Sequence, residues 1–438
     1  MSKKTSKTLF VCSDCGEEYM QWQGRCSNCG NWNTIKEFSV AVDHPGARVA
    51  SPTASQKPRV LKDVTSSNLK RMPSGFAEVD RVLGGGIVPG SVILVGGDPG
   101  IGKSTLLLQV ANLVKQPVLY VSGEESPEQV KLRADRLGLT GGNVSILAVT
   151  DVSQVQQVIE AEKPSLVIVD SIQTMYDGAY PSTPGSIVQV RETAMRIQQL
   201  AKHLNVSVIL VGHITKEGTV AGPRTLEHLV DVVLYLEGEP SHDLRILRAA
   251  KNRFGDATET GMFVMEEKGM AEVTNASSFL LQERVEAPGS VLTVVMEGSR
   301  PILIEVQALT VPTVFGNPRR TASGFDPNRL NLLLAVLQRR AGVDLSAHDV
   351  YVNIVGGLKV KEPGIDAAVC VALASARAGV SLPPSLVVVG EVGLSGELRR
   401  VSSSERREKE VATLGYTLAA GSRELKPLVE KYVKKASP

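Results

Sequence analysis

The sequence predicts an α/β protein, and three observations support this prediction. β-Branched runs alternate with helical patterns over residues 65–275, as in βαβ units that build a mainly parallel sheet. Aromatic residues make up only 4% of the 438 residues, so the core is mainly aliphatic, as in a sheet covered by helices. A second block of strand and helix patterns occupies residues 285–438.

Four segments follow from the pattern along the chain. Residues 1–35 form a cysteine-rich module, and residues 36–64 are a small, polar linker without periodicity. The two α/β domains are expected at 65–275 and 285–438. The expected strands are 91–97, 117–123, 166–171, 206–213, 231–238, 290–298, 301–311, 349–357 and 386–392. The expected helices are 103–115, 127–137, 152–162, 186–204, 327–341, 366–379, 404–414 and 423–435, with Asp326 as the N-cap of the first helix of the second block.

Residues 96–105, GGDPGIGKST, contain the pattern G-x-x-x-x-G-K-[ST] between an apolar strand and an apolar helix. This context favours a phosphate-binding loop over a chance glycine loop. Main-chain N–H groups and the helix N-terminus would hold the phosphates of ATP. Lys103 would reach the β- and γ-phosphates, and Ser104 would ligate Mg²⁺. The nucleotide-binding residues are expected to be Gly97, Asp98, Pro99, Gly100, Ile101, Gly102, Lys103, Ser104 and Thr105.

Acidic and polar residues at the ends of neighbouring strands complete this prediction. Asp170 ends the run LVIVD and would hold Mg²⁺; a strand-end turn is the alternative. Glu124 follows another strand at the edge where such sheets bind ligands, and we expect it to orient the attacking water. Alternatively, Glu124 and Glu125 cap the helix that begins near Ser126. His213 ends a further strand and is either a γ-phosphate sensor or a turn residue.

Residues 70–270 resemble the RecA-type ATPase core. The segment VSGEESPEQ resembles the strand-end glutamate segment of DnaB-type helicases, and KNRFG resembles their late Lys-x-Arg finger. In those proteins neighbouring subunits close the ATP site. The resemblance therefore implies that Arg253 acts as an arginine finger in the next subunit, and that Lys251 assists it or contacts DNA. A pair of exposed cations in a turn is the alternative.

Cys12, Cys15, Cys26 and Cys29 follow the spacing C-x₂-C-x₁₀-C-x₂-C. Two such knuckles supply the four thiolates of a tetrahedral Zn²⁺ site, and the spacing favours zinc over a redox pair. A module this small has little core, so the metal is expected to supply its folding energy. Trp22 and Trp32, the only tryptophans, both lie here. They are expected to form the module's small core, with stacking on nucleic-acid bases as the alternative.

The segments GGLKVKEPGIDAAVCVALASA and VVVGEVGLSGELRRV resemble the proteolytic domain of Lon proteases, over about residues 290–438. That domain uses a Ser-Lys dyad. Its serine position corresponds to Asp366 and its lysine position lies near Glu405, so no peptidase is expected; Ser395 lies in an ordinary turn. Cys370 is expected to pack in an apolar helix. The domain is expected to assemble subunits and to offer a basic surface from 399–410 and 426–435, although solvated helix faces explain these segments equally well.

The three parts, in this order, resemble one family of bacterial DNA repair ATPases over nearly the whole chain. This resemblance implies a homo-hexamer that uses ATP, Mg²⁺ and Zn²⁺ and is stimulated by DNA. It would move along single-stranded DNA and extend branched or D-loop intermediates with the RecA recombinase. An ATP-dependent protease and a regulatory clock-type ATPase that binds only proteins are the alternatives.

Composition restricts the remaining classes. The formal net charge is only +2, so no global basic field indicates nucleic acid. No run of 18 apolar residues is present, and the N-terminus lacks the apolar stretch of a signal peptide. We therefore expect a cytoplasmic protein without a membrane segment. In that compartment the five cysteines are not expected to form structural disulfides.

Overall fold

The computed structural model describes residues 6–12, 18–19, 21–27, 30, 32–41, 60, 70–180, 182–213, 225–238, 243–314, 316–419 and 422–433. Contacts divide the chain into two compact units. The first comprises Met1–Glu237, Leu247–Ala257 and Met265–Met270, and the second comprises the rest. No helix in the described ranges is long and apolar enough to cross a membrane.

The N-terminal module is a small antiparallel sheet in the order β2-β1-β3. Its strands are β1 (Ser6–Cys12), β2 (Glu18–Tyr19) and β3 (Ile35–Ala41). Among the side chains that the structure describes here, Cys12, Cys26 and Ile35 are buried, with Phe10 and Tyr19 packed against them. The two cysteines therefore occupy the centre of the module.

A mainly parallel sheet with the order β9-β4-β8-β7-β5-β6 forms the centre of the first unit, and the strands β10, β11 and β12, each divided between the two units, continue the sheet beyond β9. The strands are β4 (Val92–Gly97), β5 (Val118–Ser122), β6 (Val144–Ala148), β7 (Leu166–Asp170), β8 (Ser207–His213), β9 (Val232–Glu237), β10 (Leu244–Asn252), β11 (Thr260–Glu266) and β12 (Gly269–Glu272). Its helices are α1 (Ala77–Leu83), α2 (Lys103–Leu113), α3 (Pro127–Arg136), α4 (Val152–Glu162) and α5 (Ile187–Leu204), with a 3₁₀ turn at Ile172–Thr174.

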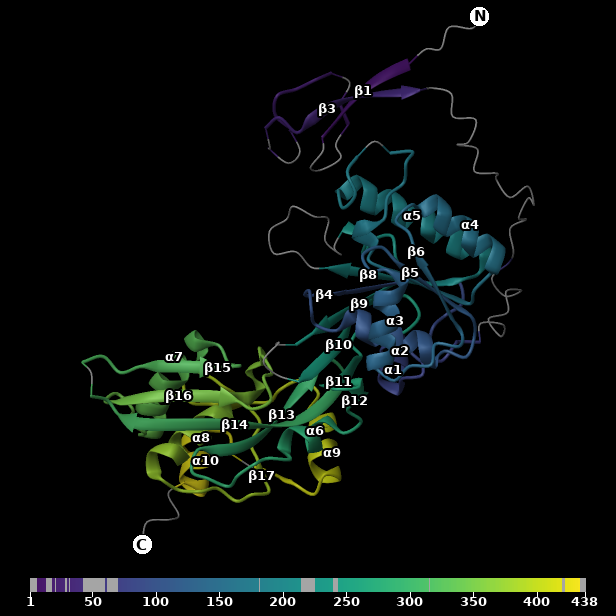
Figure 1. The fold of residues 1–438 in the computed structure, drawn as a ribbon. Coiled ribbons are helices and arrows are strands. Elements are labelled where there is room, and N and C mark those ends of the chain that lie inside the picture. The colour runs from purple at the N-terminus through teal and green to yellow at the C-terminus, as the bar shows by residue number, and fades with distance from the viewer. Residues whose placement is uncertain are drawn as a thin grey trace, which may run out of the picture. The chain divides into compact units, whose positions relative to one another are not determined.

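Helices cover both faces of this sheet. Figure 1 shows α4 and α5 on one face and α2 and α3 on the other. Val155 and Ile197 of α4 and α5 pack against Val167 and Leu210 of β7 and β8 in one buried cluster. Burial on both faces explains why the strands are continuous apolar runs rather than alternating ones.

The second unit contains a six-stranded sheet in the order β15-β16-β14-β13-β17-β20 and a hairpin of β18 and β19. The strands are β13 (Ser290–Glu297), β14 (Arg300–Pro312), β15 (Arg320–Ser323), β16 (His348–Ile354), β17 (Leu386–Val387), β18 (Glu391–Val392), β19 (Leu398–Arg399) and β20 (Thr417–Leu418). The helices are α6 (Ala276–Leu281), α7 (Pro327–Val336), α8 (Asp366–Ala378), α9 (Ser404–Thr413) and α10 (Leu425–Tyr432), with a 3₁₀ turn at Pro363–Ile365 and a π turn at Leu337–Ala341.

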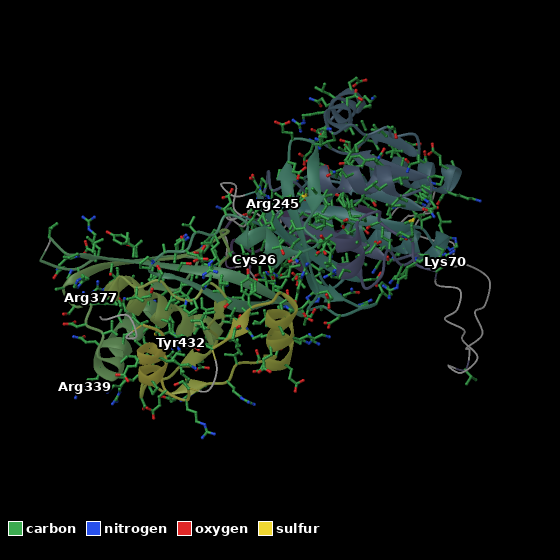
Figure 2. The ribbon with its side chains drawn as sticks, turned by 90° about the horizontal axis from the view of Figure 1, so that it is seen from below. Cys26, Lys70, Arg245, Arg339, Arg377 and Tyr432 are labelled. Carbon is green, nitrogen blue, oxygen red and sulfur yellow. The ribbon has the colours of Figure 1, made fainter. Side chains whose placement is uncertain are left out.

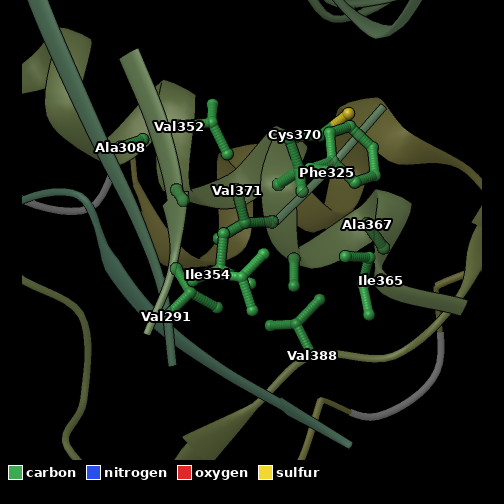
Figure 3. Packing of buried hydrophobic residues seen from close by; sticks show 14 of the residues in the cluster. Val291, Ala308, Phe325, Val352, Ile354, Ile365, Ala367, Cys370, Val371 and Val388 are labelled. Carbon is green, nitrogen blue, oxygen red and sulfur yellow. The ribbon is translucent and has the colours of Figure 1, made fainter. Parts of the chain in front are cut away.

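Helix α8 lies in the centre of this second unit. Figure 3 shows Val371 of α8 beside Val352 and Ile354 of the sheet, and Cys370 of the same helix beside Phe325. Cys370 is fully buried, which agrees with its expected packing role. In Figure 2, by contrast, Arg339 and Arg377 lie on the outer surface of the unit.

Candidate active site

The predicted phosphate loop joins the end of β4 to the start of α2. At Gly97 a side chain is excluded, because a Cβ there would lie 2.6 Å from the Leu236 carbonyl oxygen. Gly102, the N-cap of α2, has φ 111°, a conformation that favours glycine. The loop can therefore present its main-chain N–H groups and the N-terminus of α2 to a phosphate.

Lys103 is almost completely buried, with 3% of its surface exposed. Its Nζ donates hydrogen bonds to the carbonyl oxygens of Gly97 at 2.8 Å and Asp98 at 2.9 Å. Burial lowers the Lys103 pKa to about 8, and the nearby carboxylates of Asp170, Asp98 and Glu124 oppose this change. A phosphate group fits this cradle because its negative charge would compensate the buried ammonium group.

Asp170 lies at the carboxyl end of β7, on the same edge of the sheet as the loop. Its Oδ2 accepts a 2.6 Å hydrogen bond from Tyr120, and burial together with this carboxylate raises the Tyr120 pKa well above its usual value. Ser104 lies in the first turn of α2. A carboxylate and a hydroxyl at this edge are the oxygen ligands that Mg²⁺ prefers, so the residues fit the expected metal.

The two adjacent glutamates take different partners. Glu124 Oε1 accepts a 2.9 Å hydrogen bond from Ser171 Oγ and lies 3.8 Å from His213 Nε2. Glu125 instead forms an ion pair with Arg133 of α3 at 2.5 Å. Ser126 is the N-cap of α3 and accepts from the main-chain N–H of Gln129, within a capping box. Neither glutamate is the cap that the alternative interpretation required.

A hydrogen bond connects His213 to Gln173, which lies in the 3₁₀ turn shortly after Asp170. Gln173 Nε2 donates to the His213 carbonyl at 3.2 Å. Burial, and then the charge of Lys103, lowers the His213 pKa, which favours a neutral imidazole. His213 Nδ1 and Gln173 Oε1 are buried without a hydrogen-bond partner in the part of the chain that the structure describes. Residues 214–224 lie outside the described residues.

Lys251 and Arg253 lie at the amino ends of β4 and β9, the end of the same sheet that is opposite the phosphate loop. Lys251 Nζ donates to the carbonyls of Glu227 and Val230, at 2.6 and 2.8 Å. Arg253 Nη1 is 3.1 Å from Asp231, whose other carboxylate oxygen accepts from the main-chain N–H of Val92. Val92 is the first residue of β4 and the loop follows its last. At about 3.3 Å per residue, the two ends of this strand lie roughly 17 Å apart.

The structure thus gathers Glu124, Asp170 and His213 with the phosphate loop, and it places the two cations away from the loop of their own chain. Sequence reasoning missed Tyr120 and Ser171, which donate to Asp170 and Glu124, and Gln173, which donates to the His213 carbonyl. Tyr120 could have been noticed as the polar side chain of an apolar strand. The other two act through a turn whose shape the sequence does not specify.

Two of the predicted zinc ligands, Cys12 and Cys26, are completely buried in the module. A hydroxyl lies near each sulfur: Thr34 Oγ1 is 3.2 Å from Cys12 Sγ, and Tyr19 Oη is 3.1 Å from Cys26 Sγ. Polar contacts to sulfur suit thiolate ligands, so these residues fit a zinc site. Cys15 and Cys29 lie outside the described residues.

The expectation that Trp22 and Trp32 form the module's core is wrong. Trp22 is 59% and Trp32 is 68% exposed, while two cysteines and Ile35 form the core. The physical reason is the small size of the module: the buried cluster that the structure describes is built around the cysteine sulfurs and Ile35, and the two indoles lie outside it.

At the position expected for a catalytic serine, the second unit has a buried carboxylate that pairs with a partly exposed arginine. Asp366 is 0% exposed, and its two oxygens accept from Nε and Nη2 of Arg329 and from the Val392 main-chain N–H. Glu405 lies in the first turn of α9. Two residues further on, Arg407 is also buried, 2.5 Å from Glu362, so this cation does not belong to the basic surface expected over 399–410.

Two protein-family models match this chain, one over the ATPase core and one over the cysteine-rich module. The family described as "AAA domain" matches residues 57–219, and the "Rubredoxin metal binding domain" matches residues 10–37. The chain is 48% identical to the DNA repair protein RadA of Bacillus subtilis, over 94% of this chain and 91% of that one. It is 46% identical to RadA of Listeria monocytogenes, over 95% and 92%.

The chain belongs to the RadA family of DNA repair proteins. The family resemblance inferred from the motifs is therefore confirmed, as is a RecA-like α/β core with an N-terminal zinc ribbon. The AAA match supports an ATP hydrolase. Two solved structures match about half of the chain. A KaiC-like protein of Pyrococcus horikoshii has a TM-score of 0.39 at 19% identity, and the RadB recombinase has 0.37 at 27%; 99% of each of these chains is covered.

Proposed function

We propose that this protein is a Mg²⁺-dependent ATPase, stimulated by single-stranded DNA, whose active site is completed by a neighbouring subunit. The observation that carries the proposal is the position of Lys251 and Arg253. Both lie at the amino end of β4 and β9, whereas the phosphate loop lies at the carboxyl end of β4. These cations cannot serve the ATP bound by their own chain, but subunits arranged head to tail would bring them to the next one.

Within one subunit, the loop at residues 97–105 binds the phosphates of ATP, and Lys103 moves from its carbonyl partners to the β- and γ-phosphates. Ser104 and Asp170 hold Mg²⁺, which neutralises phosphate charge. Glu124, held by Ser171, orients and polarises the attacking water. Arg253 of the next subunit stabilises the charge that develops on the γ-phosphate, with Lys251 assisting.

His213 supports a link between hydrolysis and DNA. It contacts Glu124 on one side and is the last described residue before the loop at 214–224. A change at the γ-phosphate would therefore reach that loop directly. In the proposed homo-hexamer, the end of β8 at His213 is directed to the DNA, whereas Lys251 and Arg253 are directed to the ATP site of the neighbouring subunit. Repeated cycles would move the ring along a single strand and extend branched or D-loop intermediates with RecA.

The C-terminal unit is proposed to assemble subunits and not to cleave peptides. Its Asp366 is held in an ion pair by Arg329, and a carboxylate so engaged is no alkoxide nucleophile. The Cys₄ module is proposed to bind one Zn²⁺ through Cys12, Cys15, Cys26 and Cys29.

The test is the rate of ATP hydrolysis with and without single-stranded DNA, at two salt concentrations, with Lys103→Ala as the blank. We expect stimulation by DNA that weakens as salt rises, because cationic side chains meet phosphates and release counterions. Hydrolysis that is indifferent to DNA at both salt concentrations would contradict the proposal and favour an ATPase that acts on proteins.

A further inference from the structure

The two tryptophans of the N-terminal module form one exposed surface, which the proposed ATPase cycle does not use. A methyl group placed on Gly24 would lie 3.6 Å from the Trp32 ring and 3.8 Å from the Trp22 ring. Both indoles therefore border Gly24, although ten residues separate them in the chain. More than half of the surface of each is exposed. Exposing two such large side chains is costly unless the surface has a partner.

Both rings are held in place rather than left free. Trp22 Nε1 donates to the Ile35 carbonyl at 3.2 Å. The Arg25 guanidinium lies 6.0 Å from the centre of the Trp32 ring, and its Nε donates to the Gly30 carbonyl at 2.8 Å. Around them, Arg25 and Trp32 form a β-bridge, and the Asn33 main-chain N–H donates to Gly24. A ligand would find the rings already oriented, so little entropy would be lost on binding.

The polar side chains that flank the two tryptophans in the sequence indicate the class of ligand. Among the described residues that flank the two tryptophans in the sequence, the exposed ones include Gln21, Gln23, Arg25 and Asn33, which carry amides and one guanidinium. Amides and guanidinium groups pair with the edges of nucleobases, while indole faces stack on them. Among the described side chains of the module, the two indoles are the only large apolar ones that are exposed. Aliphatic anchors, which a protein partner would usually require, are missing from that set.

We propose that Trp22, Trp32 and Arg25 form a stacking platform for the unpaired bases of single-stranded nucleic acid. This inference rests on the proposed action on DNA and adds a second contact, distinct from the ATPase core. The two indoles stack on the flat faces of the bases. Every base has such a face, so the platform binds single strands with little preference for sequence. Its role is to hold unpaired bases while the ATPase core contacts the phosphates.

The experiment uses the full-length zinc-loaded protein without nucleotide. Because Trp22 and Trp32 are the only tryptophans, intrinsic tryptophan fluorescence reports on this surface alone. We expect a single-stranded oligonucleotide to quench it, and an abasic oligonucleotide of equal length, with the same phosphates, to leave it nearly unchanged. Trp32→Leu should weaken binding of the oligonucleotide about tenfold, since one stacking face is lost.

Trp32→Phe is the matched control, because a phenyl ring still stacks. It should restore most of the affinity, measured by anisotropy of a labelled oligonucleotide. Zinc content and ATP hydrolysis without DNA should be the same in both variants, which separates a binding role from a structural one. The difference in oligonucleotide affinity between Trp32→Leu and Trp32→Phe is the test of the platform itself.

Equal quenching by the abasic and normal oligonucleotides, or equal affinity of the leucine and phenylalanine variants, would overturn the proposal. If DNA still stimulates hydrolysis in either case, the proposed function stands and only the platform is wrong. If single-stranded DNA neither binds nor stimulates, both fail. A Trp32→Leu defect that appears only when RecA is present would assign the surface to protein docking and also overturn it.

Discussion

Glu124 and Glu125 are consecutive carboxylates at the end of one strand, yet they face different chemistry. Glu124 contacts Ser171 and lies near His213 at the phosphate-loop edge, whereas Glu125 is paired with Arg133 of α3. We predict that Glu124→Gln lowers the hydrolysis rate at least 100-fold and leaves ATP binding intact, because a neutral amide cannot polarise water. Steady-state hydrolysis and binding of a fluorescent ATP analogue measure the two effects.

Glu125→Gln is the control at the same strand end. It weakens a partly exposed ion pair, which contributes about 1 kcal/mol or less, and should retain at least half of the hydrolysis rate. If the two variants lost activity equally, the assignment of the water-orienting role to Glu124 would be wrong.

Individual elements were predicted from the sequence where local chemistry determines them. The loop at 97–104 lies between β4 and α2 as expected, and Asp326 caps α7 by accepting from the Arg329 main-chain N–H. β6, with partly exposed positions at the edge of the sheet, was missed because its short run carries no clear period. The position of Lys251 opposite the loop could not be predicted either, because strand order and direction depend on tertiary pairing.

The N-terminal module offers an element-scale prediction about zinc. The wild-type protein should contain one Zn²⁺ per chain, and Cys26→Ser should lose it, because Cys26 is buried at the centre of the module. The matched control is Cys370→Ser. Cys370 is a buried residue of α8, and it is far along the chain from all four predicted zinc ligands. Elemental analysis of both purified variants gives the answer. Full zinc content in Cys26→Ser would remove this cysteine from the proposed site.

At the scale of the whole molecule, the proposed active site needs a second copy of the chain. The phosphate loop, Asp170 and Glu124 share one edge of the sheet, while Arg253 is held by Asp231 at the other. A head-to-tail ring would join the two edges of neighbouring copies at every interface. The family and the fold were accessible from the sequence because their motifs are local. The proposal of a site between copies depends on the positions of the two ends of the strands in space, which no local motif gives.

The most direct test of this account mixes two inactive variants, Lys103→Ala and Arg253→Ala, and measures ATP hydrolysis with single-stranded DNA. Each variant alone should be nearly inactive. In mixed assemblies some interfaces combine an intact Lys103 with an intact Arg253, so an equal mixture should recover up to about a quarter of the wild-type rate if one interface acts alone and copies mix at random. Mixed assemblies that stay inactive, or Arg253→Ala that hydrolyses ATP at the wild-type rate by itself, would contradict the account.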